Sequence, residues 1–443
     1  MTDFDLDKQT IKDLEIFSDT RSRKSVSDFY NQTRTVGGRK FLFQLMKNPT
    51  ADIRELRERT ELIQFLSETG FDLTITSGQF EFIDHYLRLN TAPLRNNFLD
   101  AFLQNLSYRI TPTNDYYVIK SGAEQLVYLL IHLQKKSATL AGLSLPAKLA
   151  RYCQLIATFV GKQELKRLYA GRFKITYIRL NRLDNLFRKR YMEELQEVVN
   201  NVYQLDAYIS LAKVATQKNL TLPTYSDSAI PALSIDGFYH PLLSNAVPYS
   251  IALDPAVNLC FLTGPNMAGK STFLKSVGLA VYLAHVGFPV PSKRMVTTIY
   301  HGIVTTINLS DDINLGYSHF YSEVHRIRET ALKIKEKGRL FIVFDELFRG
   351  TNVKDAFDAS LLIIRSFANI RGCTFFISTH LTEVAEKLGD LSNVQFKFFD
   401  SLLVNNTPVY EYLLKTGISH ERLGLYIIKN EKIIDILESI TQE

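Results

Sequence analysis

Apolar residues recur with a helical period through the first half of the chain. The clearest runs are residues 53–66, 125–133 and 146–160. Apolar positions three and four residues apart are typical of helices that pack one face on a core. A charged run at 182–218 is too long for a helix of a compact core, so we interpret it as a rod or lever.

Beyond a Pro- and Ser-rich stretch that begins at Leu222, the pattern changes to short apolar runs separated by helical segments. The apolar runs are residues 259–262, 303–307, 340–344, 374–378 and 394–399. Strand-length runs that alternate with helices are typical of a mostly parallel α/β sheet. The sequence therefore predicts two domains: an all-α core and lever domain at 1–222, followed by an α/β domain at 223–443.

The composition is that of an ordinary soluble globular protein. The chain has 443 residues, 46% hydrophobic and 22% charged, with a net charge of +6. This charge is compatible with a nucleic-acid partner but does not require one. Cys153, Cys260 and Cys373 have no metal-binding spacing. The N-terminus lacks a signal-peptide core and no apolar run approaches the roughly 18 residues of a membrane span, so we expect a reduced, cytoplasmic protein.

Residues 259–272 carry the strongest chemical signal. An apolar run stops at Thr263, and the pattern Gly-x-x-x-x-Gly-Lys-Ser occupies 264–271, ahead of a helical pattern. In such a loop, backbone N–H groups turn towards phosphate oxygens and the helix N-terminus adds its dipole. Lys270 is expected to reach the β- and γ-phosphates, and the hydroxyl of Ser271 to complete a Mg²⁺ shell. The predicted ATP-binding residues here are Gly264, Pro265, Asn266, Met267, Ala268, Gly269, Lys270, Ser271 and Thr272.

Two adjacent carboxylates, Asp345 and Glu346, follow the apolar run 340–344. Ligands of open α/β sheets bind at this end of the strands. We expect Asp345 to hold Mg²⁺ together with Ser271, and Glu346 to orient and deprotonate the attacking water. His380 ends the next strand-like run and could reach the γ-phosphate or the water; a structural histidine is the alternative. The predicted catalytic residues are thus Lys270, Glu346 and His380.

The segment 311–323 opens a helix with Gly316 and Ser318 near its start. Such a start can bind the phosphate of a nucleotide held by another subunit, although an ordinary helix cap is the alternative. Taken together, these motifs are typical of a dimeric ABC-type ATPase.

These motifs resemble those of the MutS family of DNA mismatch-repair ATPases. Residues 263–272 are similar to the family's Thr-Gly-Pro-Asn-Met-Gly-Gly-Lys-Ser-Thr, with Ala268 in place of one Gly. Residues 345–352 are similar to Asp-Glu-Leu-Gly-Arg-Gly-Thr-Ser, with Phe348 in place of Gly. The segment 311–323 matches the family's signature at both Asp, and the stretches 6–66 and 205–215 look like the two ends of its helical core and lever.

The resemblance implies a helical core and lever domain joined to an ABC-type ATPase domain, acting as a homodimer on double-stranded DNA. Each site would be composite, with Ser318 of one subunit serving the ATP of its partner. ATP and Mg²⁺ would be the cofactors, and repair-pathway proteins possible partners. Tyr249 falls where relatives keep an aromatic ring against adenine; a plain core tyrosine is the alternative.

The chain also departs from the family's usual pattern. It begins at the core, and we recognise no Phe-x-Glu wedge of the kind that stacks on a mispaired base. The main prediction is ATP-driven clamp or lever movement on DNA, possibly mismatched, in DNA repair. One alternative is an ATPase acting on branched or recombining DNA, or on structured RNA. Another is a DNA-binding scaffold that is switched by ATP without hydrolysing it.

A basic stretch at 162–190 carries interleaved aromatic residues and is suited to phosphate contacts without sequence reading. A solvated helix face with inward-facing aromatics is the alternative. For a protein that acts on DNA, as the resemblance implies, the expected cytoplasmic location is nucleoid-associated. The predicted DNA-binding residues are Arg172, Lys174, Arg179, Arg182, Arg188, Lys189 and Arg190.

Overall fold

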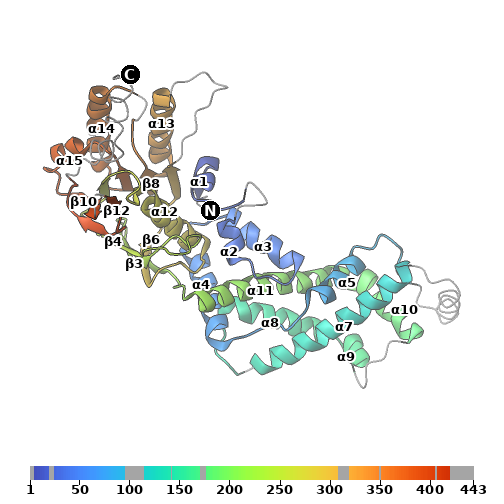
Figure 1. The fold of residues 1–443 in the computed structure, drawn as a ribbon. Coiled ribbons are helices and arrows are strands. Elements are labelled where there is room, and N and C mark those ends of the chain that lie inside the picture. Colours follow the sequence, from blue (N-terminus) through green and yellow to red (C-terminus); the bar gives the residue numbers. More distant parts are fainter. Residues whose placement is uncertain are drawn as a thin grey trace, which may run out of the picture. The chain divides into compact units, whose positions relative to one another are not determined.

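The chain folds into two compact units (Figure 1). The helical unit comprises Tyr30–Leu45 and Glu61–Thr216. The sheet unit comprises Met1–Phe29, Met46–Thr60 and Gln217–Glu443. Both the helical part and the α/β part that the sequence predicts are therefore confirmed. The computed structural model describes residues 4–18, 24–94, 114–140, 142–169, 176–307, 319–348, 351–404 and 407–419.

The compact units divide the chain at more places than the single boundary expected between residues 222 and 223. Met1–Phe29 and Met46–Thr60 belong to the sheet unit. The first of these segments contributes β1 (Asp5–Leu6), which pairs in parallel with β7 (Gly302–Thr306). A strand of two residues leaves no periodic pattern in a sequence. The assignment of 1–222 to a core and lever domain stays a prediction.

The helical unit is built from long amphipathic helices. Those that lie wholly or partly in it are α3 (Val36–Lys47), α4 (Ile53–Thr69), α5 (Ser77–Leu87), α7 (Asn114–Leu140), α8 (Ala147–Val160), α9 (Gln163–Tyr169), α10 (Tyr177–Asn185), the π-helical turn η1 (Leu186–Arg190) and α11 (Met192–Lys218). Within the described residues, no helix is both long enough and apolar enough to span a membrane.

The run 182–218 is not one continuous rod. It begins in α10, passes through the π-helical turn η1, and starts again as α11 after Tyr191 leaves the helical region at φ −120° and ψ 23°. Along α11, side chains are buried at intervals between Leu195 and Ala215 and continuously from Leu205 to Ala212. Much of α11 therefore packs against other residues, and its role as a lever stays a prediction.

Asp206 of α11 caps the start of α3. Its carboxylate accepts hydrogen bonds from the backbone N–H of Arg34 and Thr35 and from the Thr35 hydroxyl, the last at 2.7 Å. A carboxylate is favourable at a helix N-terminus, where backbone donors are otherwise unpaired. Gly38 permits the approach, because a Cβ there would lie 2.3 Å from Asp206 Oδ2. Gly37 and Gly38 both lie inside the first turn of α3.

The sheet unit is organised around a seven-stranded sheet in the order β1-β7-β8-β9-β5-β10-β13. Neighbouring strands are parallel except at the β10–β13 pair. All five predicted apolar runs are strands of this sheet. Its members not yet given are β8 (Leu340–Phe344), β9 (Thr374–Ser378), β5 (Leu259–Thr263), β10 (Val394–Phe399) and β13 (Leu414–Thr416).

A second, four-stranded sheet has the order β2-β6-β3-β4. Its strands are β2 (Thr224–Ser226), β6 (Arg294–Thr298), β3 (Leu233–Phe238) and β4 (Tyr249–Leu253), and a separate hairpin joins β11 (Leu402–Val404) to β12 (Thr407–Val409). Helix α12 (Lys270–Val286) packs against β7 and β8 of the large sheet and against β3 of the small one. A helix enclosed in this way is apolar on nearly every side, as α12 is.

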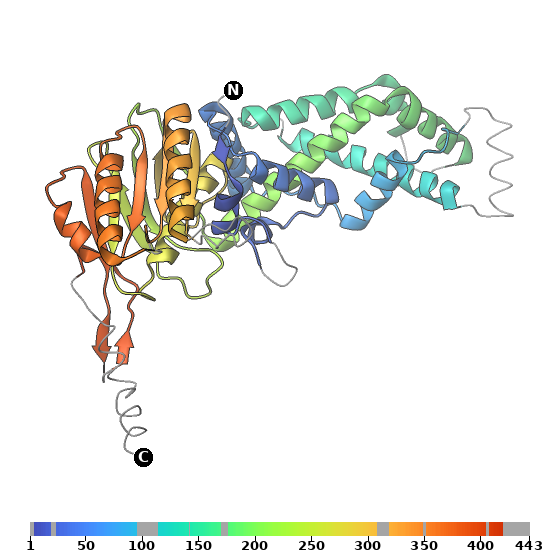
Figure 2. The same ribbon diagram turned by 90° about the horizontal axis from the view of Figure 1, so that it is seen from above.

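The remaining helices of the sheet unit are α1 (Lys8–Asp13), α2 (Val26–Tyr30), α13 (His319–Lys337), α14 (Val353–Ala368) and α15 (Thr382–Lys387). Figure 2 shows α13 and α14, in orange, lying along one face of the large sheet. Ile327 of α13 and Ile364 of α14 share a buried cluster with Ile342 of β8 and Phe375 of β9.

His285 lies fully buried near the end of α12. Its Nδ1 is 2.8 Å from the carbonyl of Val281, and its Nε2 accepts the backbone N–H of Tyr300 at 2.9 Å. Both nitrogens are used by the neutral ring, so the protonated ring would lose one of these bonds. Burial accordingly lowers the pKa of His285 from 6.5 to about 4.

We expect His285 to make the sheet unit less stable in mild acid. The unfolded histidine takes up a proton below pH 6.5, whereas the folded one resists until about pH 4. Stability is thus fully present above pH 6.5 and is lost as the pH falls towards 4, by on the order of 3 kcal/mol. Thermal unfolding followed across this range should show the slope. In His285→Gln, which offers one donor and one acceptor without titrating, the slope should be smaller; an unchanged slope would contradict the assignment.

The close approach of α5 and α7 depends on Gly122. A Cβ at this position would lie 2.2 Å from Cβ of Tyr86 and 2.9 Å from the carbonyl oxygen of Phe82. Gly122→Ala should therefore lower the free energy of unfolding by about 1–3 kcal/mol through overpacking. Gly78, on α5, has open space around it and serves as the matched control. Gly78→Ala should be neutral or stabilising by up to about 1 kcal/mol; equal effects in denaturant titrations would argue against the packing explanation.

Candidate nucleotide-binding site

A tight loop joins the buried central strand β5 to α12. Gly264 and Gly269 both have positive φ, at 137° and 110°. A Cβ on Gly264 would lie 2.6 Å from the carbonyl oxygen of Phe399, so a glycine is needed there for space as well as for backbone conformation. Met267, at φ 68°, points outward and is 82% exposed. The loop that the sequence predicts is thus formed between a strand and a helix, as expected.

Lys270 turns back into this loop. Its Nζ donates to the carbonyl oxygens of Gly264 at 2.8 Å and Pro265 at 3.1 Å, and its side chain is only 4% exposed. Nζ also lies 3.9 Å from Oε1 of Glu346. A buried ammonium group is therefore fixed beside the start of α12, where an anion is favoured by the helix dipole as well.

Asp345 connects the loop to two neighbouring strands. Its Oδ2 accepts a hydrogen bond from Ser271 Oγ at 2.5 Å, and its Oδ1 accepts one from Ser378 Oγ. Its backbone N–H donates to the carbonyl oxygen of Thr306 at 2.9 Å. The carboxylate and the Ser271 hydroxyl are hard oxygen donors of the kind that Mg²⁺ prefers. Among the described residues no group of three or more His, Cys, Asp or Glu is placed to hold a metal.

Glu346 follows in an unusual backbone conformation, with φ 56°. Its N–H donates to the carbonyl oxygen and to the hydroxyl of Ser378, both at 3.1 Å. Non-glycine residues at positive φ are uncommon and cluster at functional sites. This turn directs the carboxylate of Glu346 towards Lys270 while Asp345 faces Ser271.

His380 lies at the same edge of the sheet. Strand β9 pairs in parallel with β5 and β8, with Leu262 opposite Ser378. The backbone N–H of Thr379 donates to Leu262, and His380, the next residue, is exposed. The structure therefore brings Lys270, Ser271, Asp345 and Glu346 together and leaves His380 accessible beside them.

Two family models match most of the chain. The family model described as MutS domain V matches residues 260–442, and the one described as MutS domain III matches residues 9–212. The chain belongs to the MutS family. The resemblance inferred from the sequence motifs is thereby confirmed.

Curated relatives carry the name DNA mismatch repair protein MutS. That of Bacillus velezensis is 28% identical over 264 residues, 58% of this chain and 30% of the relative. That of Thermotoga maritima is 29% identical over 56% of this chain and 31% of its own length. That of Petrotoga mobilis is 24% identical over 85% of this chain and 46% of its own length. The chain thus spans less than half the length of these MutS relatives.

Phe348 occupies the position at which the MutS signature has glycine. The backbone conformation at this position makes a residue other than glycine energetically costly. Its φ is 61°, a conformation that favours glycine. The side chain is 3% exposed, and its ring lies 5.6 Å from that of Phe320 on α13. Burial of a large aromatic ring against α13 offsets the backbone cost.

Tyr249 is 5% exposed within an aromatic cluster. Its ring centroid lies 5.4 Å from Phe273 and 5.7 Å from Phe399. Burial raises the pKa of its hydroxyl to about 12. These contacts favour the core alternative for its ring. Its role against adenine stays a prediction.

Sequence reasoning missed Tyr412, a second aromatic residue beside the loop. A Cβ on Gly269 would lie 3.2 Å from Cδ1 of Tyr412, whose side chain is 41% exposed. An exposed ring next to a phosphate loop is available for stacking on a base. Its position follows β12 and has no spacing relative to the loop that a sequence pattern could reveal.

The predicted DNA-binding residues differ in how free their charges are. Arg188 is 4% exposed at its side chain and pairs with the buried Asp184 at 2.6 Å, so it serves packing rather than a charged surface. Arg190, 57% exposed, pairs with Glu164 at 2.5 Å. Arg182 and Lys189 are exposed, and Arg179 is half-buried. Arg172, Lys174 and Ser318 lie outside the described residues.

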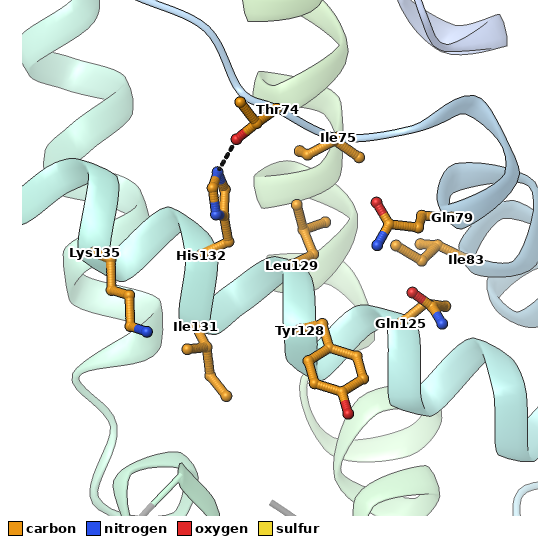
Figure 3. A pocket seen from close by; sticks show the side chains of 10 residues that line it. All are labelled: Thr74, Ile75, Gln79, Ile83, Gln125, Tyr128, Leu129, Ile131, His132 and Lys135. Carbon is orange, nitrogen blue, oxygen red and sulfur yellow. Dashed lines mark hydrogen bonds between the residues drawn. The ribbon is translucent and has the colours of Figure 1, made fainter.

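The helical unit also contains a pocket between α7 and the start of α5, about 290 Å³ in volume (Figure 3). His132 Nε2 and Thr74 Oγ1 are 3.1 Å apart on one side of it. Gln79, Ile83 and Gln125 lie along another side of it. Its lining mixes apolar residues with amides, unlike the phosphate loop of the sheet unit.

Proposed function

We propose that this chain binds ATP, hydrolyses it with the help of Mg²⁺, and couples the reaction to DNA binding in MutS-type mismatch repair. The observation that carries the proposal is the convergence of Lys270, Ser271, Asp345 and Glu346 at one edge of a parallel sheet. The name of the MutS relatives supports the DNA-repair part of the proposal.

Each of these residues has a role in phosphoryl transfer to water. The N–H groups of the loop and Lys270 bind the phosphates, and Lys270 stabilises the charge that develops on them. Ser271 and Asp345 would hold Mg²⁺, which supplies further neutralisation of phosphate charge when bound. Glu346 accepts a proton from the attacking water, and its fixed backbone turn limits the directions from which it can do so. His380 contacts the γ-phosphate or that water.

The proposed active form is a homodimer with composite sites. Ser318 of the partner subunit would complete each ATP site, and ATP-driven closure would move the lever helix. The described part of α11, which is buried for most of its length, is suited to transmit such a movement as a rigid body.

Double-stranded DNA, mismatched or not, is the proposed partner. Arg182 and Lys189 are exposed positive charges of the helical unit. Arg179 and Arg190 lie close to them in the sequence. Contacts of this kind bind phosphates and carry no sequence information by themselves. Recognition of a mismatch would therefore rest on DNA deformability rather than on these side chains.

The deciding experiment measures ATP turnover by the purified chain alone and with homoduplex, mismatched and branched DNA at one salt concentration. Stimulation by mismatched duplex above homoduplex is the expected result. Stimulation by branched DNA only would replace mismatch repair with a recombination substrate. Equal turnover in all four conditions would exclude DNA as the coupled ligand.

Two variants separate binding from chemistry. Glu346→Gln should keep ATP affinity and lower turnover by at least about 100-fold, because the general base is lost. Lys270→Ala should instead weaken ATP binding itself, since the buried ammonium group is removed from the loop. Fluorescent-nucleotide titration and phosphate release measure the two quantities. Normal turnover by Glu346→Gln, or normal affinity of Lys270→Ala, would remove the role assigned to that residue.

The exposed arginine and lysine should contribute to DNA affinity without selecting a sequence. Replacing both Arg182 and Lys189 by Gln should weaken binding to all duplexes alike and reduce the slope of log affinity against log salt by about two. The matched control neutralises Lys120 and Lys135 of α7 in the same unit and should leave the slope unchanged. Equal losses in the two double variants would indicate a general charge effect and no local DNA contact.

A further inference from the structure

The N-terminal segment of the chain lies along β7 and supplies β1, the edge strand of the large sheet. β1 pairs with only the first residues of β7, Gly302 and Ile303. Further along β7, side chains of α1 replace a neighbouring strand: Thr10 Oγ1 accepts the N–H of Thr305 at 3.0 Å, and Asp13 Oδ2 accepts the N–H of Ile307 at 2.9 Å. These bonds satisfy backbone donors that would otherwise be unpaired at a sheet edge.

Arg326 of α13 holds the end of β7 from another direction. Its guanidinium donates to the carbonyl oxygen of Thr305 at 2.9 Å and to the hydroxyl of Thr306 at 3.3 Å. The same group forms an ion pair with Asp7 at 2.8 Å. The side chains are 11% and 20% exposed, so solvent screens the pair only in part. Burial alone would raise the pKa of Asp7. The charge of Arg326 and the hydrogen bonds from Arg326 and Thr10 outweigh this effect and lower the pKa to about 2.

One backbone hydrogen bond connects the end of β7, which Arg326 contacts, to the nucleotide site. The residue that Arg326 holds, Thr306, uses its carbonyl oxygen to accept the N–H of Asp345 at 2.9 Å. Asp345 in turn accepts the hydroxyl of Ser271. A continuous chain of contacts therefore runs from Asp7, through Arg326 and the end of β7, to the carboxylate proposed to hold Mg²⁺.

We propose that Asp7 and Arg326 are positioning residues of the ATPase site, which fix the backbone of Asp345 for metal binding by clamping the end of β7. The inference rests on the proposed function. It gives a positioning role in the site to residues near the start of the sequence, which are distant in sequence from every nucleotide-binding motif. Asp7 also accepts the N–H of Thr10 at 2.8 Å as the N-cap of α1, so the clamp and the fold of the segment share one carboxylate.

Two variants test the clamp while preserving the fold. Asp7→Asn keeps a good helix cap and removes the charge. Arg326→Lys keeps the charge, but a lysine cannot bond Thr305, Thr306 and Asp7 with one planar group. Two controls match them: Asp52→Asn, an exposed carboxylate that accepts the N–H of Arg54 at 2.9 Å at the start of α4, and Arg328→Lys, an exposed arginine on the same helix as Arg326.

The measured quantities are kcat, the Mg²⁺ concentration that gives half-maximal turnover, and nucleotide affinity with and without Mg²⁺. We expect Arg326→Lys to lower kcat about tenfold and raise the half-saturating Mg²⁺ concentration several-fold, with a smaller change of the same kind in Asp7→Asn. Affinity without Mg²⁺ should stay within about twofold of wild type. Neither control should change these quantities.

Three outcomes would count against the clamp or against the proposed function. Wild-type values in Arg326→Lys and Asp7→Asn would overturn it, as would equal losses in the variants and their controls. If the wild-type chain itself does not hydrolyse ATP, the proposed function fails separately. The clamp is then judged by whether the variants, and not the controls, lose the Mg²⁺-dependent gain in nucleotide affinity.

Discussion

The carboxylate of Asp345 is the point on which the sheet unit's chemistry depends. It accepts hydrogen bonds from the hydroxyl groups of Ser271 on α12 and Ser378 at the end of β9. The backbone N–H of Asp345 donates to the carbonyl oxygen of Thr306 on β7. One residue, through its side chain and its backbone, thereby links the phosphate loop to the strands on either side of β8. Because parallel strands all deliver their carboxyl ends to one edge, a displacement of any of these strands would alter the oxygen atoms offered to a metal.

Much of this edge follows from local sequence. The five apolar runs are strands, and the loop begins and ends at glycines whose positive φ is needed for the turn. The pairing of Lys270 with loop carbonyls is likewise encoded within seven residues, 264–270. Such features are predictable because the signal and the structure it produces lie in the same stretch of chain.

Other features were not predictable because they arise from contacts between distant segments. Arg188 looks like a surface charge in a basic run, yet Asp184 and the carbonyl oxygens of Thr91 and Ala92 enclose it. Residues of α11 look like a charged rod, yet they are buried by helices from other parts of the chain. The place of Asp7 depends on Arg326, more than 300 residues later. In each case the local pattern fits two environments, and only tertiary packing selects one.

The turn after β8 shows how the chain accommodates strain at its site. Glu346 and Phe348 both have positive φ, separated by the buried Leu347. Hydrogen bonds that its N–H donates to Ser378 hold Glu346, and packing against Phe320 on α13 holds Phe348. A glycine at position 348 would remove the backbone strain, but it would also remove the ring contact between this turn and α13. Phe348 instead makes the conformation of Glu346's turn depend on the position of α13, the helix whose Arg326 also clamps β7. The two contacts connect the proposed general base and the proposed metal-binding carboxylate to the same helix.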